Sequence, residues 1–155
     1  MKPIRVLIVD DHRDGADSLG LLVEELGHIA HVTYGGRQAL DVASDFRPDL
    51  VFVDMAMPDV GGCSLVRQFR QMPAFTHTRI VAITGHTGEE QRNLAMQSGC
   101  DAVFFKPFTL THIREALASG DLVVADANQA PRVPERGSHG TGQRLPIGEA
   151  GTSVN

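Results

Sequence analysis

The sequence has few of the features that mark a membrane-bound, secreted or disulfide-stabilised protein. It contains no run of about 18 apolar residues that could span a bilayer. The apolar run near its start is broken by Asp10 and Asp11, so it lacks the continuous apolar core of a signal peptide. Its two cysteines, Cys63 and Cys100, form neither a CxxC pair nor a metal-finger spacing. These absences predict a soluble, cytoplasmic protein with unpaired thiols.

Clusters of basic residues are also missing. The chain of 155 residues has 14 Lys and Arg against 19 Asp and Glu, a net charge of −5. Contacts to the phosphates of nucleic acids need patches of Lys and Arg. We therefore expect neither a nucleic acid nor a membrane among the partners of this protein.

Short β-branched runs alternate with stretches of helical periodicity up to about residue 119. Strands are predicted at residues 4–9, 29–34, 50–53, 80–83 and 102–105. Apolar residues at helical spacing predict helices at 16–26, 37–44, 65–69, 94–98 and 110–118, the last with Thr109 as its N-cap. Parallel strands need crossover connections, and right-handed crossovers place helices on both faces of a sheet. The pattern predicts an α/β fold with a doubly wound, five-stranded parallel sheet and five helices.

The composition changes near residue 120. Residues 120–155 contain six Gly and three Pro but no aromatic residue. Such a segment cannot bury enough apolar surface to offset the entropy of ordering. We expect a folded domain over residues 1–119 and a disordered tail over 120–155, with a minor alternative in which Leu122-Val123-Val124 extends or caps the last helix.

Aspartates stand where two of the predicted strands end. Asp10 and Asp11 follow residues 4–9, and Asp54 follows residues 50–53. Ligands of doubly wound sheets bind beyond the carboxyl ends of the strands. Three carboxylates in one pocket raise one another's pKa unless a cation lies between them, and Mg²⁺ prefers oxygen ligands of this kind. The spacing therefore predicts a magnesium site, although any one of these aspartates alone would be read as a solvated strand end.

Two further polar residues are expected at the same end of the sheet. Lys106 follows residues 102–105 and is restrained by Pro107, while Thr84 follows residues 80–83. Taken alone, Lys106 is typical of an exposed surface lysine, and Thr84 of a hydroxyl that satisfies its own backbone. Their coincidence with three aspartates favours one shared site.

The residues at these positions resemble the motif set of the response regulator receiver family, and the resemblance covers residues 4 to about 119. It rests on Asp10-Asp11, Asp54 followed by Met57-Pro58 and Gly62, Thr84-Gly85, and Lys106-Pro107-Phe108. Residues 10–19 are similar to receivers that stand alone or are attached to hybrid sensor kinases. The resemblance implies a CheY-like, flavodoxin-like sheet of order 2-1-3-4-5.

The resemblance also implies a phosphorylation switch of a two-component system or phosphorelay. Asp54 would accept a phosphoryl group from a histidine kinase, a histidine phosphotransfer protein or a small phosphodonor. In this family Mg²⁺ would be ligated by Asp11, Asp54 and the backbone carbonyl of Ala56, with Asp10 holding it through water. Phosphoryl transfer needs mainly positioning and charge neutralisation, which a metal ion supplies.

The remaining site residues receive their roles from the same resemblance. Lys106 would neutralise one phosphoryl oxygen, and Thr84 would swing to hydrogen-bond another. Phosphorylation would change a docking face in residues 89–119, and this face would contact a downstream protein target. The protein would be a monomer or weak dimer, and not a turnover enzyme, since it would catalyse only its own phosphorylation and slow dephosphorylation.

Two positions depart from the family pattern. The residue three before Lys106 is usually aromatic or histidine and moves together with the threonine, but here it is Val103. The residue two after Asp54 is Ala56, which has no side chain to orient an attacking water. We therefore expect a long-lived phosphorylated state, an effect that His86, two after the threonine, could offset.

Two alternative functions remain open at this point. A receiver-like scaffold could use the same docking face without phosphorylation, although the complete set of acids, Thr84 and Lys106 argues against it. A haloacid-dehalogenase phosphatase also uses an aspartate nucleophile, but it needs a second acid where Asp54-Met55-Ala56 has none. The residues after 119 are too few and too rich in Gly and Pro for a helix-turn-helix, so no attached output domain is expected.

Overall fold

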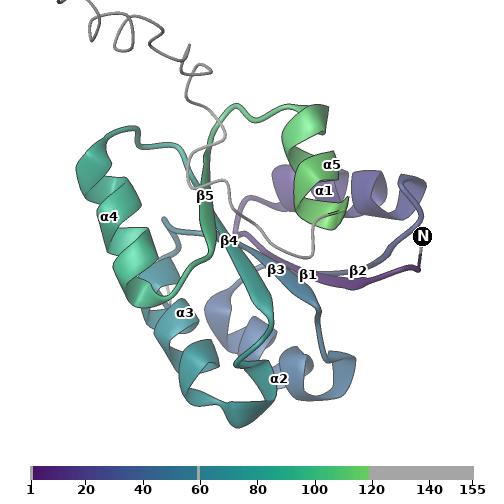
Figure 1. Ribbon diagram of the computed structural model, residues 1–155, viewed down its shortest axis with the longest axis horizontal. Helices are drawn as coiled ribbons and strands as arrows, with labels where there is room; N and C mark the ends of the chain where they lie inside the picture. The colour runs from purple at the N-terminus through teal and green to yellow at the C-terminus, as the bar shows by residue number, and fades with distance from the viewer. Residues whose placement is uncertain (1, 59, 119–155) are drawn as a thin grey trace, which may run out of the picture.

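The computed structural model describes residues 2–58 and 60–118, in which five strands alternate with helices (Figure 1). The strands are β1 (Arg5–Val9), β2 (Ile29–Thr33), β3 (Leu50–Asp54), β4 (Arg79–Thr84) and β5 (Ala102–Phe105). The helices are α1 (Arg13–Glu25), α2 (Gly36–Phe46), α3 (Gly62–Gln71), α4 (Glu89–Ser98) and α5 (Leu110–Ala118), with a short 3-10 helix, η1 (Pro73–Phe75), after α3. The predicted alternation of strands and helices is confirmed.

The strands form one parallel sheet in the order β2-β1-β3-β4-β5. This order confirms the predicted doubly wound, flavodoxin-like topology. From β1 the chain first adds β2 on one side and then crosses to β3 on the other side. The carboxyl ends of β1 and β3 therefore lie next to each other where the strand order reverses, which is where such sheets bind ligands.

Both faces of the sheet are covered by helices. One apolar cluster joins the sheet to α1 and α5, and the other joins it to α2, α3 and α4. Successive side chains of a strand point to opposite faces, and in β5 Phe104 belongs to the first cluster while Val103 and Phe105 belong to the second. Every residue of β3 is buried. This packing on two sides fixes where the strands end and so where their terminal side chains lie.

Some element boundaries differ from those expected from the sequence. Helix α4 begins at Glu89 instead of residue 94, because its first residues are polar and largely exposed and so give no apolar periodicity. The short helix η1 was not predicted at all. Helix α5 has the predicted bounds, and Thr109 caps it as expected: its Oγ1 accepts the backbone N–H of His112 at 3.4 Å, while His112 Nδ1 accepts the N–H of Thr109 at 3.1 Å.

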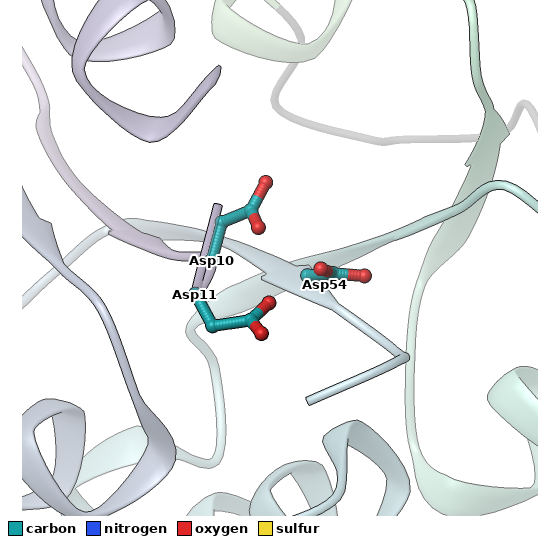
Figure 2. A group of neighbouring side chains, drawn as sticks. All are labelled: Asp10, Asp11 and Asp54. Carbon is teal, nitrogen blue, oxygen red and sulfur yellow. The ribbon is translucent and has the colours of Figure 1, made fainter. Parts of the chain in front are cut away.

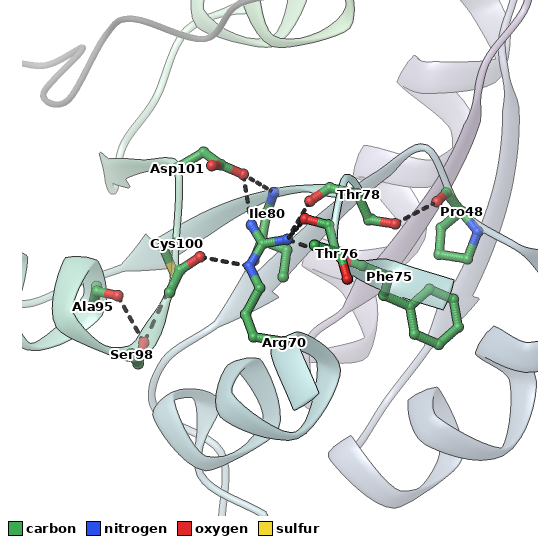
Figure 3. A network of polar contacts seen from close by, with 11 residues as sticks. Pro48, Arg70, Phe75, Thr76, Thr78, Ile80, Ala95, Ser98, Cys100 and Asp101 are labelled. Atoms are coloured by element: carbon green, nitrogen blue, oxygen red, sulfur yellow. Dashed lines mark hydrogen bonds and ion pairs between the residues drawn. The ribbon is translucent and has the colours of Figure 1, made fainter. Parts of the chain in front are cut away.

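One arginine of α3 connects several segments at the amino-terminal end of the sheet (Figure 3). Its guanidinium lies 2.8 Å from the carboxylate of Asp101, which also accepts the backbone N–H of Ile80 at 2.8 Å. The same Arg70 donates to four carbonyls, those of Gly99, Phe75, Thr76 and Thr78, at 2.7–3.3 Å. Through Arg70, α3 is tied to η1, to the start of β4 and to the loop before β5.

The predicted tail over residues 120–155, including Leu122-Val123-Val124, lies outside the described residues. Within residues 2–58 and 60–118, no helix is both long enough and apolar enough to cross a lipid bilayer. Both cysteines are free; Cys100 is buried, and this burial raises the pKa of its thiol to about 12.

Candidate functional site

Three carboxylates meet at the carboxyl end of the sheet, as Figure 2 shows. Asp10 and Asp11 follow β1 directly, and Asp54 is the last residue of β3. One carboxylate oxygen from each of the three lies within 4.8 Å of the others. Asp10 and Asp54 are buried, whereas Asp11 is exposed. The structure thus brings together the acids that were predicted from their positions at strand ends.

Backbone amides hold two of these carboxylates in place. Asp10 Oδ1 accepts the N–H of His12 at 2.9 Å, and Asp54 Oδ1 accepts the N–H of Ala56 at 3.0 Å. Each bond spans two residues, the local turn that a short acidic side chain forms with its own backbone. These bonds leave Oδ2 of Asp54 for a ligand and Oδ2 of Asp10 for a cationic partner.

Lys106 reaches the same site from β5. Its Nζ lies 3.6 Å from Asp10 Oδ2, and its side chain is half-buried. The backbone N–H of Lys106 donates to the carbonyl of Thr84 at 2.8 Å, which pairs the ends of β4 and β5, and the Lys106–Pro107 peptide bond is cis. The predicted convergence of a lysine on the acid group is therefore present, with Asp10 as its direct partner.

Thr84 is placed beside the site, but its hydroxyl is already engaged. The residue is buried at the end of β4, and its Oγ1 accepts the backbone N–H of His86 at 3.1 Å. This is the local bond that the sequence suggested for a lone threonine at a strand end. The same hydroxyl donates to the carbonyl of His86 at 3.5 Å, so its O–H must leave that carbonyl before it can donate to a ligand above Asp54.

Burial raises the pKa of the Asp54 carboxyl above its usual range. The N–H of Ala56 and the charge of Lys106 act in the opposite direction, while neighbouring Asp10 adds to the rise. A buried carboxylate next to a second one is costly in its ionised form unless a cation compensates the charge. The pocket therefore favours the binding of a cation.

The donor set suits a hard divalent cation. All three side chains offer oxygen, and one of them is open to solvent, so water molecules can complete the coordination. Mg²⁺ binds through one or two carboxylates and keeps several waters, whereas transition metals favour nitrogen or sulfur ligands. No His or Cys belongs to the cluster that the described residues form here. The residues present fit Mg²⁺.

The raised pKa of Asp54 leads to a stability prediction. The folded state binds the Asp54 proton more tightly than the unfolded state does, so ionisation of Asp54 destabilises the fold as the pH rises through the unfolded and then the folded pKa. We expect Asp54→Asn to raise the unfolding free energy of the metal-free protein at pH 7, and this gain to shrink towards about pH 4.

Urea denaturation in EDTA at both pH values measures this difference. Adding Mg²⁺ should narrow the gap at pH 7, because only the wild-type carboxylate gains from the cation. If the variant were no more stable than the wild type at pH 7 without metal, then ionised Asp54 would not destabilise the metal-free fold.

Two further residues shape the site: Gly62, which belongs to the motif set, and His12, whose role the sequence did not indicate. A Cβ built on Gly62, the first residue of α3, would lie 2.7 Å from the carbonyl oxygen of Asp54 and 2.6 Å from Met55 Cα. Glycine is needed there because α3 starts directly against the strand end. His12 caps α1 by accepting the N–H of Gly15 on its Nδ1 at 3.2 Å. Histidine is not among the common capping residues, which is why its role was not predicted.

Solved structures of known proteins share this fold. The chemotaxis protein CheY4 of Vibrio cholerae superposes with a TM-score of 0.70 at 25% identity, covering 75% of this chain and 100% of its own. A structure described as FixJ-N gives a TM-score of 0.70 at 28% identity, covering 78% of this chain and 95% of its own.

Comparisons of sequence agree with those of structure. The polar-differentiation response regulator DivK of Brucella anthropi is 30% identical over 119 residues, 76% of this chain and 95% of DivK. The response regulator MprA of Mycolicibacterium vanbaalenii is 32% identical over 111 residues, 72% of this chain and 47% of MprA. The family model described as the response regulator receiver domain matches residues 6–118. With its sheet order and its acid pocket in place, the chain belongs to the response regulator receiver domain family of two-component signalling.

Proposed function

We propose that this protein is a phosphorylation switch that accepts a phosphoryl group on Asp54 from a histidine kinase or a histidine phosphotransfer protein. The observation that carries the proposal is the meeting of three carboxylates within 4.8 Å, with Lys106 Nζ 3.6 Å from one of them. A scaffold without phosphotransfer has no use for buried acids whose ionised form is disfavoured. Family membership supports the same function.

In the proposed reaction, Asp54 is the nucleophile. A carboxylate oxygen of Asp54 attacks the phosphorus atom of the phosphohistidine, and the phosphorus–nitrogen bond breaks with its electron pair passing to the imidazole. The N–H of Ala56 donates to Asp54 Oδ1 at 3.0 Å and so fixes the orientation of the carboxylate. Lys106, whose Nζ lies 3.6 Å from Asp10 Oδ2, neutralises charge on a phosphoryl oxygen.

Mg²⁺ belongs to this proposal as the resident cofactor. Asp11, Asp54 and the backbone carbonyl of Ala56 would hold it directly, with Asp10 acting through water. When bound, the ion supplies the positive charge that lets phosphoryl oxygens approach three acids. Asp10 stays paired with Lys106 and with the N–H of His12, so it orients the pocket even without touching the metal.

The proposed response to phosphorylation starts at Thr84. A phosphoryl group on Asp54 offers new acceptor oxygens, and the Thr84 hydroxyl turns its O–H from the carbonyl of His86 to one of them. Val103 is fully buried in β5 and lies in the cluster beneath α4, so no aromatic ring at this position can follow the threonine. We therefore expect the signal to pass through the backbone of the β4–α4 loop.

The proposed output face comprises residues 89–119, as far as α5 is described. Leu94 and Met96 of α4 and Leu110 of α5 are exposed apolar residues there. A protein target would recognise this face. The protein would act in the cytoplasm as a monomer or weak dimer. It would be no turnover enzyme, since it transfers a phosphoryl group only to itself.

A direct test uses acetyl phosphate as a small phosphodonor. The purified chain is incubated with acetyl phosphate and Mg²⁺, and its intact mass is measured with and without EDTA. We expect a gain of one phosphoryl group only when Mg²⁺ is present. In parallel, beryllofluoride with Mg²⁺ should shift the NMR signals of Thr84, His86 and α4. No mass gain and no shift would reject the proposal and favour the scaffold function.

The lifetime of the phosphorylated state gives a further prediction. Ala56, two residues after Asp54, has no side chain that could position a water molecule for attack on the phosphorus. We expect Ala56→Asn to shorten the half-life of phosphorylated Asp54 by about ten-fold, since its amide can orient water. The half-life is measured from the release of phosphate. The variant His86→Ala is measured in parallel, because His86 is the other side chain that could affect the attacking water. An unchanged half-life in Ala56→Asn would contradict this explanation.

A further inference from the structure

A groove runs along the amino-terminal end of the sheet, opposite the acid pocket. One part has a volume of about 570 Å³ and lies between the end of α2 and η1, and a second part of about 380 Å³ lies beside the start of β1. Asp49 and His77 line both parts, so the two are continuous. We call this the amino-end groove. The proposed phosphotransfer gives it no role.

The amino-end groove combines apolar surface with an excess of positive charge. Its apolar lining includes Pro3, Ile4 and Phe75. Its charged side chains are those of Lys2, Arg47, Arg79 and Asp49. The single acid among them, Asp49, already accepts the backbone N–H of Arg5 at 2.8 Å. A fitting ligand therefore presents apolar side chains flanked by carboxylates.

The chain itself leaves the described part of the structure next to this groove. Arg79, which lines the groove, donates from Nη1 to the carbonyl of Ala116 at 2.8 Å, and α5 ends at Ala118. An extended chain covers about 3.4 Å per residue, so residues 119–126 can span about 27 Å. That reach is enough to follow the groove from its second part into the first.

The segment that continues from α5 has the matching chemistry. Residues 121–126 read Asp-Leu-Val-Val-Ala-Asp, an apolar core with an acid at each end. We propose that this segment docks in the amino-end groove, with its apolar side chains on Ile4 and Ala74 and its two acids facing the basic side chains. Burial of apolar surface drives the contact, and the charges set its direction along the groove.

This inference is independent of the proposed function. The groove and the acid pocket lie at opposite ends of the parallel strands, so docking of residues 121–126 needs neither Mg²⁺ nor phosphorylation. Asp54→Asn should leave every NMR signal of the groove unchanged. The two proposals can therefore fail separately.

NMR of the full chain tests the docking with paired variants. In Leu122→Ser/Val124→Ser, we expect the amide signals of Ile4, Ala74 and His77 to shift while that of Ala56 does not. In the wild type, the amides of residues 122–124 should exchange with solvent at least ten-fold more slowly than in Asp121→Lys/Asp126→Lys. The control Glu135→Lys/Glu149→Lys makes the same change in net charge farther along the chain and should keep the slow exchange.

A charge swap sharpens the test. Lys2→Glu should weaken the protection of residues 122–124, and combining it with Asp121→Lys should restore part of it. Signals that shift only along α5 would mean that residues 122–124 extend that helix, and this would overturn the proposal. Groove shifts that grow with protein concentration would assign the groove to a second copy of the chain and would also overturn it, as would no shift at all.

Discussion

Replacing Asp54 with asparagine is expected to abolish the acceptance of a phosphoryl group. The amide has nearly the shape of the carboxylate and can still accept the N–H of Ala56, which now lies 3.0 Å from Asp54 Oδ1. It lacks the negative charge and the nucleophilic oxygen that form the new bond to phosphorus. Incubation with acetyl phosphate and Mg²⁺ should leave the intact mass of the variant unchanged, against a gain of one phosphoryl group in the wild type.

Asp45→Asn provides the matched control. Asp45 is exposed on α2 and belongs to no acid cluster among the described residues, so its replacement removes the same charge without touching the site. We expect this variant to be phosphorylated like the wild type. If Asp54→Asn still gained a phosphoryl group, then the acceptor would be a different residue, and the roles proposed for Asp10 and Asp11 would have to be revised.

Replacing Arg70 with methionine is expected to lower the unfolding free energy by about 3 kcal/mol, because the loss leaves Asp101 and several backbone carbonyls without their charged donor. The side chain of Arg70 is only 21% exposed, while that of Asp101 is 39% exposed and so partly compensated by water. Methionine keeps the apolar part of the side chain, which lies near Gly99, where a Cβ would come within 2.7 Å of Arg70 Cγ. Urea denaturation at pH 7 measures the difference.

Arg67→Met on the same helix is the control for this prediction. Arg67 is exposed and makes no ion pair among those found in the described residues, so we expect its replacement to change the unfolding free energy by less than about 0.5 kcal/mol. Equal effects of the two variants would show that the hydrogen bonds of Arg70 add nothing to stability. Arg70 lies far along the sheet from Asp54, so a folded Arg70→Met protein should still accept a phosphoryl group.

The boundaries of the helices show where local sequence patterns are sufficient to predict an element and where they are not. Helix α5 was predicted with its observed bounds because apolar residues and a capping threonine mark both its face and its start. The start of α4 was missed because residues 89–93 face largely towards solvent, and an exposed turn has no apolar period to detect. The 3-10 helix at Pro73–Phe75 was missed because three residues are too few to show any period.

Local patterns in the sequence were sufficient to predict the sheet and the position of the acid pocket. Parallel strands end at one edge, so Asp10, Asp11, Asp54 and Lys106 could be assigned to one site from their positions at strand ends alone. The folded structure was needed to show that Lys106 pairs with Asp10, that Arg70 reaches Asp101, and that the amino-end groove lies beside the end of α5. A periodic pattern reports how a residue relates to its own helix or strand, whereas contacts between distant segments depend on how those elements pack against each other.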